Sequence, residues 1–200
     1  MPSSRQQRVV LVDNHDSYTF NLAAQLRAAG AEVRVLVNDD PAVAAVAPGE
    51  LDALVISPGP GSPLNAADVG HLPALLDRMT QTPVLGVCLG HQLLAVHARA
   101  GITRIEPHHG HVSEVAHDGT GPLAGLPSPL RATRYHSLAV APGDAAIRVT
   151  ATAEDGVIMG LEVVGRPWWG VQFHPESIAT EYGDAMVTTF LDSVVAGVEG

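Results

Sequence analysis

The first half of the chain alternates short apolar runs with segments whose apolar residues recur every three or four positions. The short runs are rich in β-branched residues and predict buried strands, and the helical spacing of the other segments predicts amphipathic helices. Such alternation is typical of a parallel sheet with helices on both faces. The predicted strands are Val9–Val12, Val33–Val37, Ala53–Ile56 and Pro83–Val87, and the predicted helices are Thr19–Ala29, Ala66–Met79 and His91–Arg99.

The second half of the chain has a different pattern, with β-rich runs separated by Gly, Pro and Asp turns. These runs predict β-hairpins that join the same sheet. An amphipathic segment at Tyr182–Val195 predicts a closing helix, and the Ala-rich stretch Ala42–Ala47 predicts a short helix or loop. The predicted hairpin strands are Val112–Ala116, Leu130–Tyr135, Ile147–Ala153, Val157–Val163 and Trp168–Phe173.

Together these patterns predict an α/β fold, with a mostly parallel central sheet flanked by helices and a β-hairpin-rich second half. A length of 200 residues suits one well-buried domain. We expect residues 1–7 to be a disordered or extended tail, and residues 8–197 to form this single domain.

Composition narrows the classes of protein that the chain can belong to. Hydrophobic residues make up 46% of it and charged residues 16%, which favours a globular fold over disorder. The net charge is -10, and the eleven basic residues are all Arg without a basic run, so we expect no nucleic-acid partner. One cysteine allows no internal disulfide, and no apolar run approaches the roughly 18 residues of a membrane span. With no leader pattern at the start, we expect a soluble cytoplasmic protein without a membrane partner.

A candidate nucleophile lies between a predicted strand and a predicted helix, in Gly86-Val87-Cys88-Leu89-Gly90. The segment has the form of the G-x-S-x-G elbow with sulfur in place of oxygen. Glycines on both sides permit the sharp turn, and the positive end of the following helix favours the thiolate of Cys88. The alternative is that Cys88 is a small buried apolar residue in an ordinary turn.

The candidate general base is His174, because it follows a predicted strand and precedes Pro175-Glu176. Pro175 favours extended geometry for the residue before it, which lets His174 and Glu176 project to the same side. Glu176 can then accept from one imidazole nitrogen and direct the other toward sulfur. Alternatively, His-Pro-Glu is a surface turn with a solvated carboxylate.

Backbone donors for an oxyanion are expected at the Pro-Gly-Pro-Gly loop that follows the strand Ala53–Ile56. The N–H of Gly59 and the N–H of Leu89 would form a two-donor hole, and Gly61 would let the backbone approach a small substrate. The alternative is a rigid strand-to-helix turn. His108, His109 and His111 are close enough to suggest a metal cluster, but no second cysteine or matching carboxylate spacing accompanies them, so we expect no metal.

These segments together resemble those of class I, triad-type glutamine amidotransferases, from Val9 to about Leu191. The resemblance is strongest to the small subunit, or component II, of the synthases that use chorismate, and it implies a flavodoxin-like α/β fold. The motifs that carry it are Val12–Asn21, Ser57–Gly61, Gly86–Gln92, Thr133–Leu138 and Gly170–Ser177.

The resemblance implies that Cys88, His174 and Glu176 are the catalytic triad that releases ammonia from glutamine, and that no cofactor is needed. It also implies a heteromeric synthase partner that uses the ammonia to aminate chorismate. Between 4-amino-4-deoxychorismate synthase and anthranilate synthase, we favour the former. The residues that would hold glutamine are Gly59, Pro60, Gly61, Leu89, Gln92, Ser137 and Leu138.

Two positions depart from the family's pattern. The chain reads His109-Gly110-His111 where such subunits commonly have His-Gly-Lys, and Ala100-Gly101 where they have paired glycines. Neither change affects the triad, but the first bears on the identity of the partner. Two other functions stay open: a stand-alone cysteine hydrolase of γ-glutamyl or peptide bonds, and a non-catalytic regulatory subunit.

Overall fold

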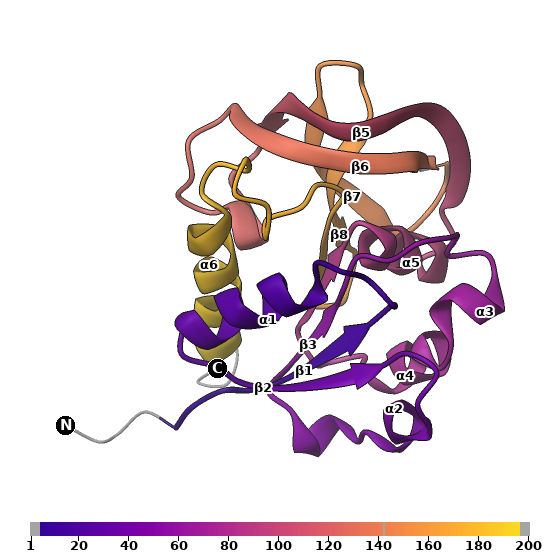
Figure 1. Ribbon diagram of the computed structural model, residues 1–200, viewed down its shortest axis with the longest axis vertical. Coiled ribbons are helices and arrows are strands. Elements are labelled where there is room, and N and C mark those ends of the chain that lie inside the picture. The colour runs from indigo at the N-terminus through magenta and orange to yellow at the C-terminus, as the bar shows by residue number, and fades with distance from the viewer. Residues whose placement is uncertain (1–4, 142, 197–200) are drawn as a thin grey trace.

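A computed structural model describes residues 5–141 and 143–196, which form one nine-stranded sheet with helices on both of its faces (Figure 1). The strand order is β2-β1-β3-β4-β9-β8-β7-β5-β6. In β1, Leu11 faces one side and Val12 the other, as the period-2 geometry of a strand requires. The sheet therefore has two buried faces, as predicted for the first half of the chain.

Five strands form the parallel part of the sheet. β9 is its last member, although it comes from the end of the chain, and it pairs with β4 over four residues of each strand. The carboxyl ends of β4 and β9 consequently lie side by side at one edge of the sheet. The five strands are β1 (Arg8–Asp13), β2 (Glu32–Val37), β3 (Ala53–Ile56), β4 (Val84–Val87) and β9 (Trp168–Val171).

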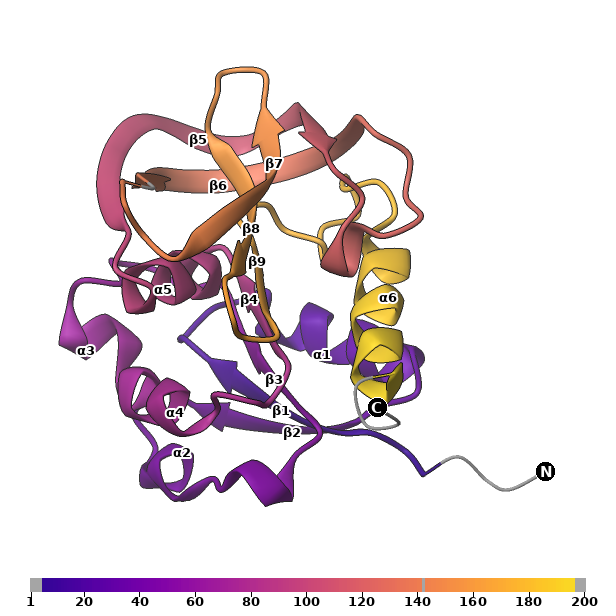
Figure 2. The same ribbon diagram turned by 180° about the vertical axis from the view of Figure 1, so that it is seen from behind.

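The other strands pair in antiparallel fashion and curl over the parallel part, with the β7–β8 hairpin projecting from it (Figure 2). The hairpins predicted for the second half therefore join the same sheet, which is mixed, with four parallel and four antiparallel pairings. These strands are β5 (Gly101–His117), β6 (Leu130–Ala141), β7 (Ile147–Ala153) and β8 (Ile158–Val163).

The helices divide between the two faces (Figures 1 and 2). Helices α1 and α6 pack on one face with the 3-10 turn η2, through residues such as Leu22 and Phe190. Helices α2, α4 and α5 pack on the other through residues such as Leu75 and Leu94. Their bounds are α1 (Thr19–Ala28), α2 (Pro41–Ala45), η1 (Pro48–Glu50), α3 (Ala66–Val69), α4 (Leu72–Arg78), α5 (Leu89–His97), η2 (Gly121–Leu123) and α6 (Gly183–Ala196).

Residues 5–7, the described part of the predicted tail, are tied to the turn before β3 and to helix α6. Arg5 donates to the Asp52 carboxylate at 2.7 Å, and Gln7 Nε2 donates to the Leu191 carbonyl at 2.7 Å. The remainder of that prediction and residue 197 fall outside the described residues. Among the helices that are described, none combines the length and apolar character that crossing a membrane demands.

Several predicted elements were wrong in extent, among them Leu130–Tyr135, which is the first half of β6, and two of these errors have a clear physical cause. The predicted strand Val112–Ala116 is only the end of β5, which runs for 17 residues and is bulged between Arg104 and His111. The rest of β5 is polar, because most of its residues are exposed, and a polar sequence gives no strand signal. Pairing with β6 makes this segment a strand.

The second error is the predicted helix Ala66–Met79, which is two helices, α3 and α4, separated at Gly70. Gly70 has φ 51°, a conformation that is easy for glycine and strained for other residues. A Cβ there would lie 2.4 Å from the carbonyl oxygen of Asn38, so the break is fixed by a tertiary contact rather than by local periodicity.

Gly70→Ala is predicted to lower the free energy of unfolding by about 3 kcal/mol, because backbone strain and a clash with Asn38 act together. The matched control is Gly30→Ala. Gly30 also has a positive φ, of 98°, but a Cβ there meets nothing within 4 Å, so only strain of about 1 kcal/mol is expected. Urea denaturation measures both, and equal losses would contradict the role of the Asn38 contact.

Candidate active site

Cys88 occupies the turn between β4 and α5 in a strained backbone conformation, with φ 52° and ψ -100°. Its N–H donates to the carbonyl of Val171 on β9 at 2.8 Å, which anchors the turn to the neighbouring strand. Cys88 is also the N-cap of α5, so the positive end of the helix lies beside the residue. The side chain is buried and 6% exposed.

The glycines on either side of Cys88 are required by close backbone contacts. A Cβ at Gly86 would lie 2.5 Å from the carbonyl carbon of Gly90, and a Cβ at Gly90 would lie 2.5 Å from the carbonyl oxygen of Ile56. Helix α5 therefore starts directly against β3 and β4, at Leu89 rather than at the predicted His91. This close packing holds the cysteine at the carboxyl edge of the sheet.

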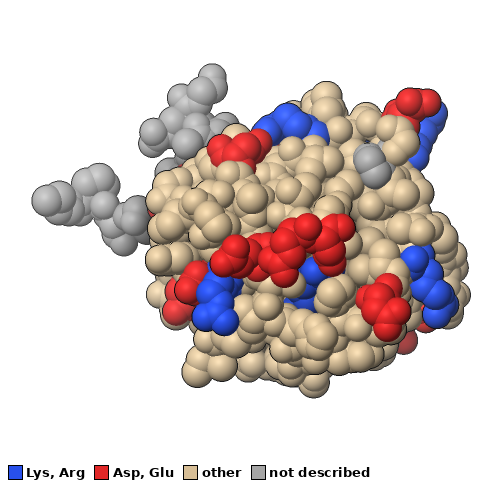
Figure 3. Space-filling model, turned by 90° about the horizontal axis from the view of Figure 1, so that it is seen from above, with Lys and Arg blue, Asp and Glu red and all other residues tan. Residues whose placement is uncertain are grey.

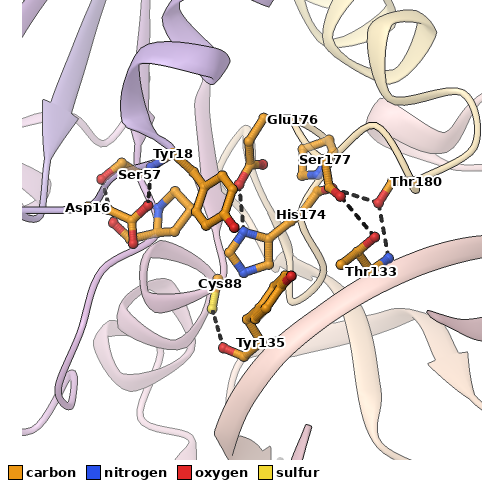
Figure 4. Close-up of polar contacts among 12 residues, drawn as sticks. Asp16, Tyr18, Ser57, Cys88, Thr133, Tyr135, His174, Glu176, Ser177 and Thr180 are labelled. Atoms are coloured by element: carbon orange, nitrogen blue, oxygen red, sulfur yellow. Dashed lines mark hydrogen bonds and ion pairs between the residues drawn. The ribbon is translucent and has the colours of Figure 1, made fainter. Parts of the chain in front are cut away.

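His174 and Glu176 form a buried pair just after β9, with Nδ1 of His174 2.5 Å from Oε1 of Glu176. Their loop is fixed to β6 and to the following turn (Figure 4). The N–H of His174 donates to the Thr133 carbonyl at 3.1 Å, and the hydroxyl of Thr180 donates to the His174 carbonyl at 2.7 Å. The alternative of a solvated surface turn is excluded for this pair, since both side chains are buried.

Two tyrosine rings enclose the His174 imidazole. The ring centroids of Tyr18 and Tyr135 lie 5.9 Å and 5.5 Å from that of His174 (Figure 4). Burial lowers the pKa of His174, but Cys88 and Glu176 outweigh it and raise the pKa to about 10. His174 Nε2 is buried and has no hydrogen-bond partner among the described residues. The imidazole is therefore held as a cation with one N–H left for another partner.

A cavity of about 150 Å³ opens beside Cys88. The structure brings together at this cavity all seven residues that the sequence nominated for glutamine binding, together with the sulfur. His109, Tyr135 and His136 also line it, and the sequence had assigned none of these three to the substrate site. The seven are Gly59, Pro60, Gly61, Leu89, Gln92, Ser137 and Leu138.

The loop after β3 that carries two of these glycines is held by a buried polar contact with Asn14. Asn14 donates to Ser57 from its N–H and from its side chain, each at 2.9 Å. A Cβ at Gly59 would lie 2.5 Å from the Cβ of Asn14, and a Cβ at Gly61 would lie 2.1 Å from the Asp68 carboxylate. Glycine is thus needed at both positions for packing as well as for access to the cavity.

Gln172 is a site residue that the sequence interpretation missed. It is fully buried, and its Nε2 lies 3.5 Å from Cys88 Sγ. Residues two apart at the end of a strand face the same side, so the position of His174 could have indicated Gln172. Tyr18, far away in the sequence, offered no such signal.

The three histidines weighed as a metal cluster lie on β5, where the ring centroids of His108 and His111 are 5.6 Å apart. His109 lines the cavity, whereas Nε2 of His108 lies 3.5 Å from the Asp155 carboxylate. Among the described residues, no group of three or more His, Cys, Asp or Glu side chains is arranged to hold a metal ion. Asp155 instead forms an ion pair with the buried Arg134, at 2.8 Å.

Acidic side chains form a band across the face above the antiparallel strands, with arginine side chains beside it (Figure 3). The arrangement agrees with the net charge of -10. A surface of this sign repels a phosphate backbone.

A family model described as Glutamine amidotransferase class-I matches residues 10–194. The chain belongs to this family. The resemblance deduced from the motifs is therefore confirmed, and it extends over almost the whole chain.

Relatives of this chain carry the names of two kinds of synthase. It is 51% identical over 190 residues to an aminodeoxychorismate synthase of Streptomyces griseus, in a match that covers 92% of this chain and 26% of that protein. It is 47% identical over 191 residues to anthranilate synthase component 2 of Mycobacterium tuberculosis, covering 92% and 81%. The chain spans about a quarter of the length of the Streptomyces griseus and Streptomyces pristinaespiralis aminodeoxychorismate synthases.

Solved structures share the fold. A Thermoplasma acidophilum protein described as one subunit of a GMP synthase superposes with a TM-score of 0.87 at 23% identity, covering 98% of both chains. A glutamine amidotransferase from Thermotoga maritima gives 0.78 at 17% identity, covering 96% of this chain and 99% of that one. At these identities the likeness concerns the fold alone, and it confirms the predicted α/β class.

The buried His91, the third residue of α5, is expected to make the stability of the protein sensitive to acid. Burial lowers its pKa to about 3. Below pH 6.5 the unfolded chain binds a proton at His91 and the folded chain does not. The free energy of unfolding is therefore unaffected by this group above pH 6.5, and it falls as the pH drops toward 3, by about 1.4 kcal/mol per pH unit. His91→Gln should reduce the slope by the contribution of His91, while that of the buried His136, whose pKa is lowered to about 4, remains; urea unfolding at several pH values measures both slopes. Equal slopes in both proteins would contradict the assignment.

The raised pKa of His174 predicts that the ring stays protonated until well above neutral pH. Glu176→Gln removes the partner carboxylate, so His174 should release its proton at a lower pH than in the wild type. NMR of proteins labelled at the histidine rings follows this titration directly. An unchanged midpoint in the variant would show that Glu176 does not stabilise the cation.

Proposed function

We propose that this chain hydrolyses the side-chain amide of glutamine, with Cys88, His174 and Glu176 as its triad, and delivers the ammonia to a chorismate-aminating synthase. The observation that carries the proposal is the strained Cys88 turn at the mouth of a small cavity, with the buried His174–Glu176 pair beside it. A cavity of about 150 Å³ is smaller than the roughly 300–1,000 Å³ typical of sites for drug-sized ligands, which favours a free amino acid.

In the first half of the reaction, the Cys88 thiolate attacks the Cδ carbonyl carbon of glutamine and a C–S bond forms. The carbonyl oxygen becomes an oxyanion, which the N–H groups of Gly59 and Leu89 would receive. Neither N–H donates to an acceptor in the described part of the chain, so both are available. Protonated His174 then gives its Nε2 proton to the amide nitrogen, and ammonia leaves as the C–N bond breaks.

In the second half, the thioester between Cys88 and the glutamyl group is hydrolysed. His174, now neutral, takes a proton from water, and the resulting hydroxide attacks the thioester carbon. Glutamate leaves as the C–S bond breaks, and the thiolate is restored beside protonated His174. Glu176 keeps the ring oriented and favours its cationic form throughout.

The remaining residues of the cavity would hold the amino-acid part of glutamine. Gln92 uses its Nε2 on Leu138 and Gln172, at 2.9 Å and 3.0 Å, which leaves its Oε1 to accept from the substrate's ammonium group. Ser137 and Leu138 line the cavity from β6, and Pro60 and Gly61 line it from the loop after β3. Such walls on two sides give a close fit to one small polar molecule.

The synthase partner is inferred from the relatives. Those at 51% and 44% identity are named aminodeoxychorismate synthases, and those named anthranilate synthase component 2 reach 47%. We therefore favour a partner that makes 4-amino-4-deoxychorismate over one that makes anthranilate. We also place the chain in the cytoplasm, where a single catalytic thiol stays reduced.

Cys88→Ala is predicted to abolish glutamine-dependent product formation in the complex with its synthase, while ammonia-dependent formation stays within about twofold of the wild type. The reason is that ammonia bypasses the triad but still requires the synthase. The assay mixes the purified chain with candidate synthases, chorismate and glutamine or an ammonium salt, and identifies the aminated product by mass spectrometry.

The chain offers a convenient control, because Cys88 is its only cysteine. Alkylation of the wild type with iodoacetamide should therefore reproduce the effect of the substitution. An equal loss of both activities would contradict the triad. Full-rate glutamine hydrolysis without any synthase would favour a stand-alone hydrolase, and failure of a glutamine analogue to label Cys88 in the complex would favour a non-catalytic subunit.

A further inference from the structure

Gln172 contacts the sulfur of Cys88, although it is neither part of the proposed triad nor a lining residue of the cavity. Its exposed fraction is 0%, and its backbone N–H donates to the Met159 carbonyl on β8 at 2.9 Å. The side chain therefore starts from a fixed backbone position. Its Nε2 lies 3.5 Å from Cys88 Sγ, within hydrogen-bond range for sulfur.

The orientation of the Gln172 side-chain amide follows from the hydrogen bonds of Gln92. The carbonyl of Leu138 requires a donor, so Gln92 turns its Nε2 toward it, at 2.9 Å. The second hydrogen of that Nε2 meets Oε1 of Gln172 at 3.0 Å. The NH₂ group of Gln172 must then face the sulfur, because its oxygen is already in use.

The same chain of hydrogen bonds continues to the antiparallel strands. Nδ1 of His136 lies 2.9 Å from the Leu138 carbonyl, and Arg134 Nε donates to His136 Nε2 at 3.1 Å. Since Arg134 is only a donor, His136 Nε2 must accept and its Nδ1 carries the proton. Asp155 holds Arg134 from the β7–β8 turn, at 2.8 Å. Each of these hydrogen bonds thus has a single possible direction. The His136 and Gln92 branches meet at the Leu138 carbonyl, and the Gln92 branch ends with an N–H of Gln172 aimed at Cys88.

We propose that Gln172 is a positioning residue for the nucleophile, whose side-chain NH₂ group holds the Cys88 thiolate in place and stabilises its negative charge. The inference rests on the proposed role of Cys88 in glutamine hydrolysis. A thiolate accepts hydrogen bonds more strongly than a thiol, so this contact favours the reactive form. It also restrains the sulfur at the strained turn without occupying the substrate's volume.

The test uses two variants of similar size, Gln172→Met and Gln172→Glu, in the full-length chain with its synthase. Met removes the donor, and Glu places a second negative charge beside the sulfur. We expect kcat for glutamine to fall about 10- to 100-fold in Gln172→Met and further in Gln172→Glu, with KM within about threefold of the wild type. Ammonia-dependent synthesis should not change.

A second readout separates this role from a purely structural one. The rate of Cys88 alkylation by iodoacetamide is measured against pH in the isolated chain. His174 and Glu176 contribute to every curve, so only differences between variants report on residue 172. The midpoint should move to higher pH in Gln172→Met and further in Gln172→Glu, by about one unit or more for the loss of a hydrogen bond to a charged group.

The matched controls are Gln7→Met and Gln7→Glu. Gln7 also donates through its side-chain Nε2, at 2.7 Å, but to the Leu191 carbonyl of α6 and not to Cys88. Neither change at Gln7 should alter kcat or the alkylation curve. Gln172 variants whose kcat and curve match the wild type would overturn the inference, and so would a fall in kcat with an unmoved curve.

If the Gln172 variants do not fold, as judged by circular dichroism, NMR of the otherwise unaltered chain decides. The side-chain NH₂ resonances of Gln172 should shift in Cys88→Ala while those of Gln7 do not, and unmoved Gln172 resonances would overturn the inference. These outcomes differ from failure of the proposed function, in which the wild-type complex itself would not hydrolyse glutamine.

Discussion

The close approach of helix α5 to strands β3 and β4 is the constraint on which the active site depends. Gly86 and Gly90 have no room for a Cβ, so the chain must turn sharply between them and Cys88 must take a positive φ. The turn places the sulfur at the carboxyl edge of the parallel strands, beside the start of a helix. The other parts of the site, including His174 beyond β9, are arranged around a sulfur that cannot move far from this position.

Much of this arrangement could be predicted because it is encoded by neighbouring residues. Alternating periodicity identified the parallel strands and the helices that cover them, and the comparisons confirm the fold class and the family. The nucleophile turn and the His-Pro-Glu segment are local motifs, each with a physical reason for its residue types. The roles of Cys88, His174 and Glu176 remain predictions, which the geometry of the site supports.

The features that sequence reasoning missed depend on residues far apart in the chain. Gly70 interrupts a helical pattern because Asn38 approaches it, and β5 is long because β6 pairs with it despite its polar sequence. Gln172 acquires significance only when Gln92 and Cys88 lie next to it, 80 and 84 positions away. The two-residue spacing from His174 indicates the side that Gln172 faces, but not which residues pack against it there, because such contacts depend on how separate elements pack.

The pairing of β4 with β9 has a consequence for the newly made protein. The strand before Cys88 is synthesised before the antiparallel strands, and the strand before His174 is synthesised after them. Until β9 docks, Cys88 lacks both the neighbouring His174 and the Val171 carbonyl that anchors its turn. Under the proposed mechanism, the thiol of the nascent chain therefore becomes an activated nucleophile only when this sheet has assembled.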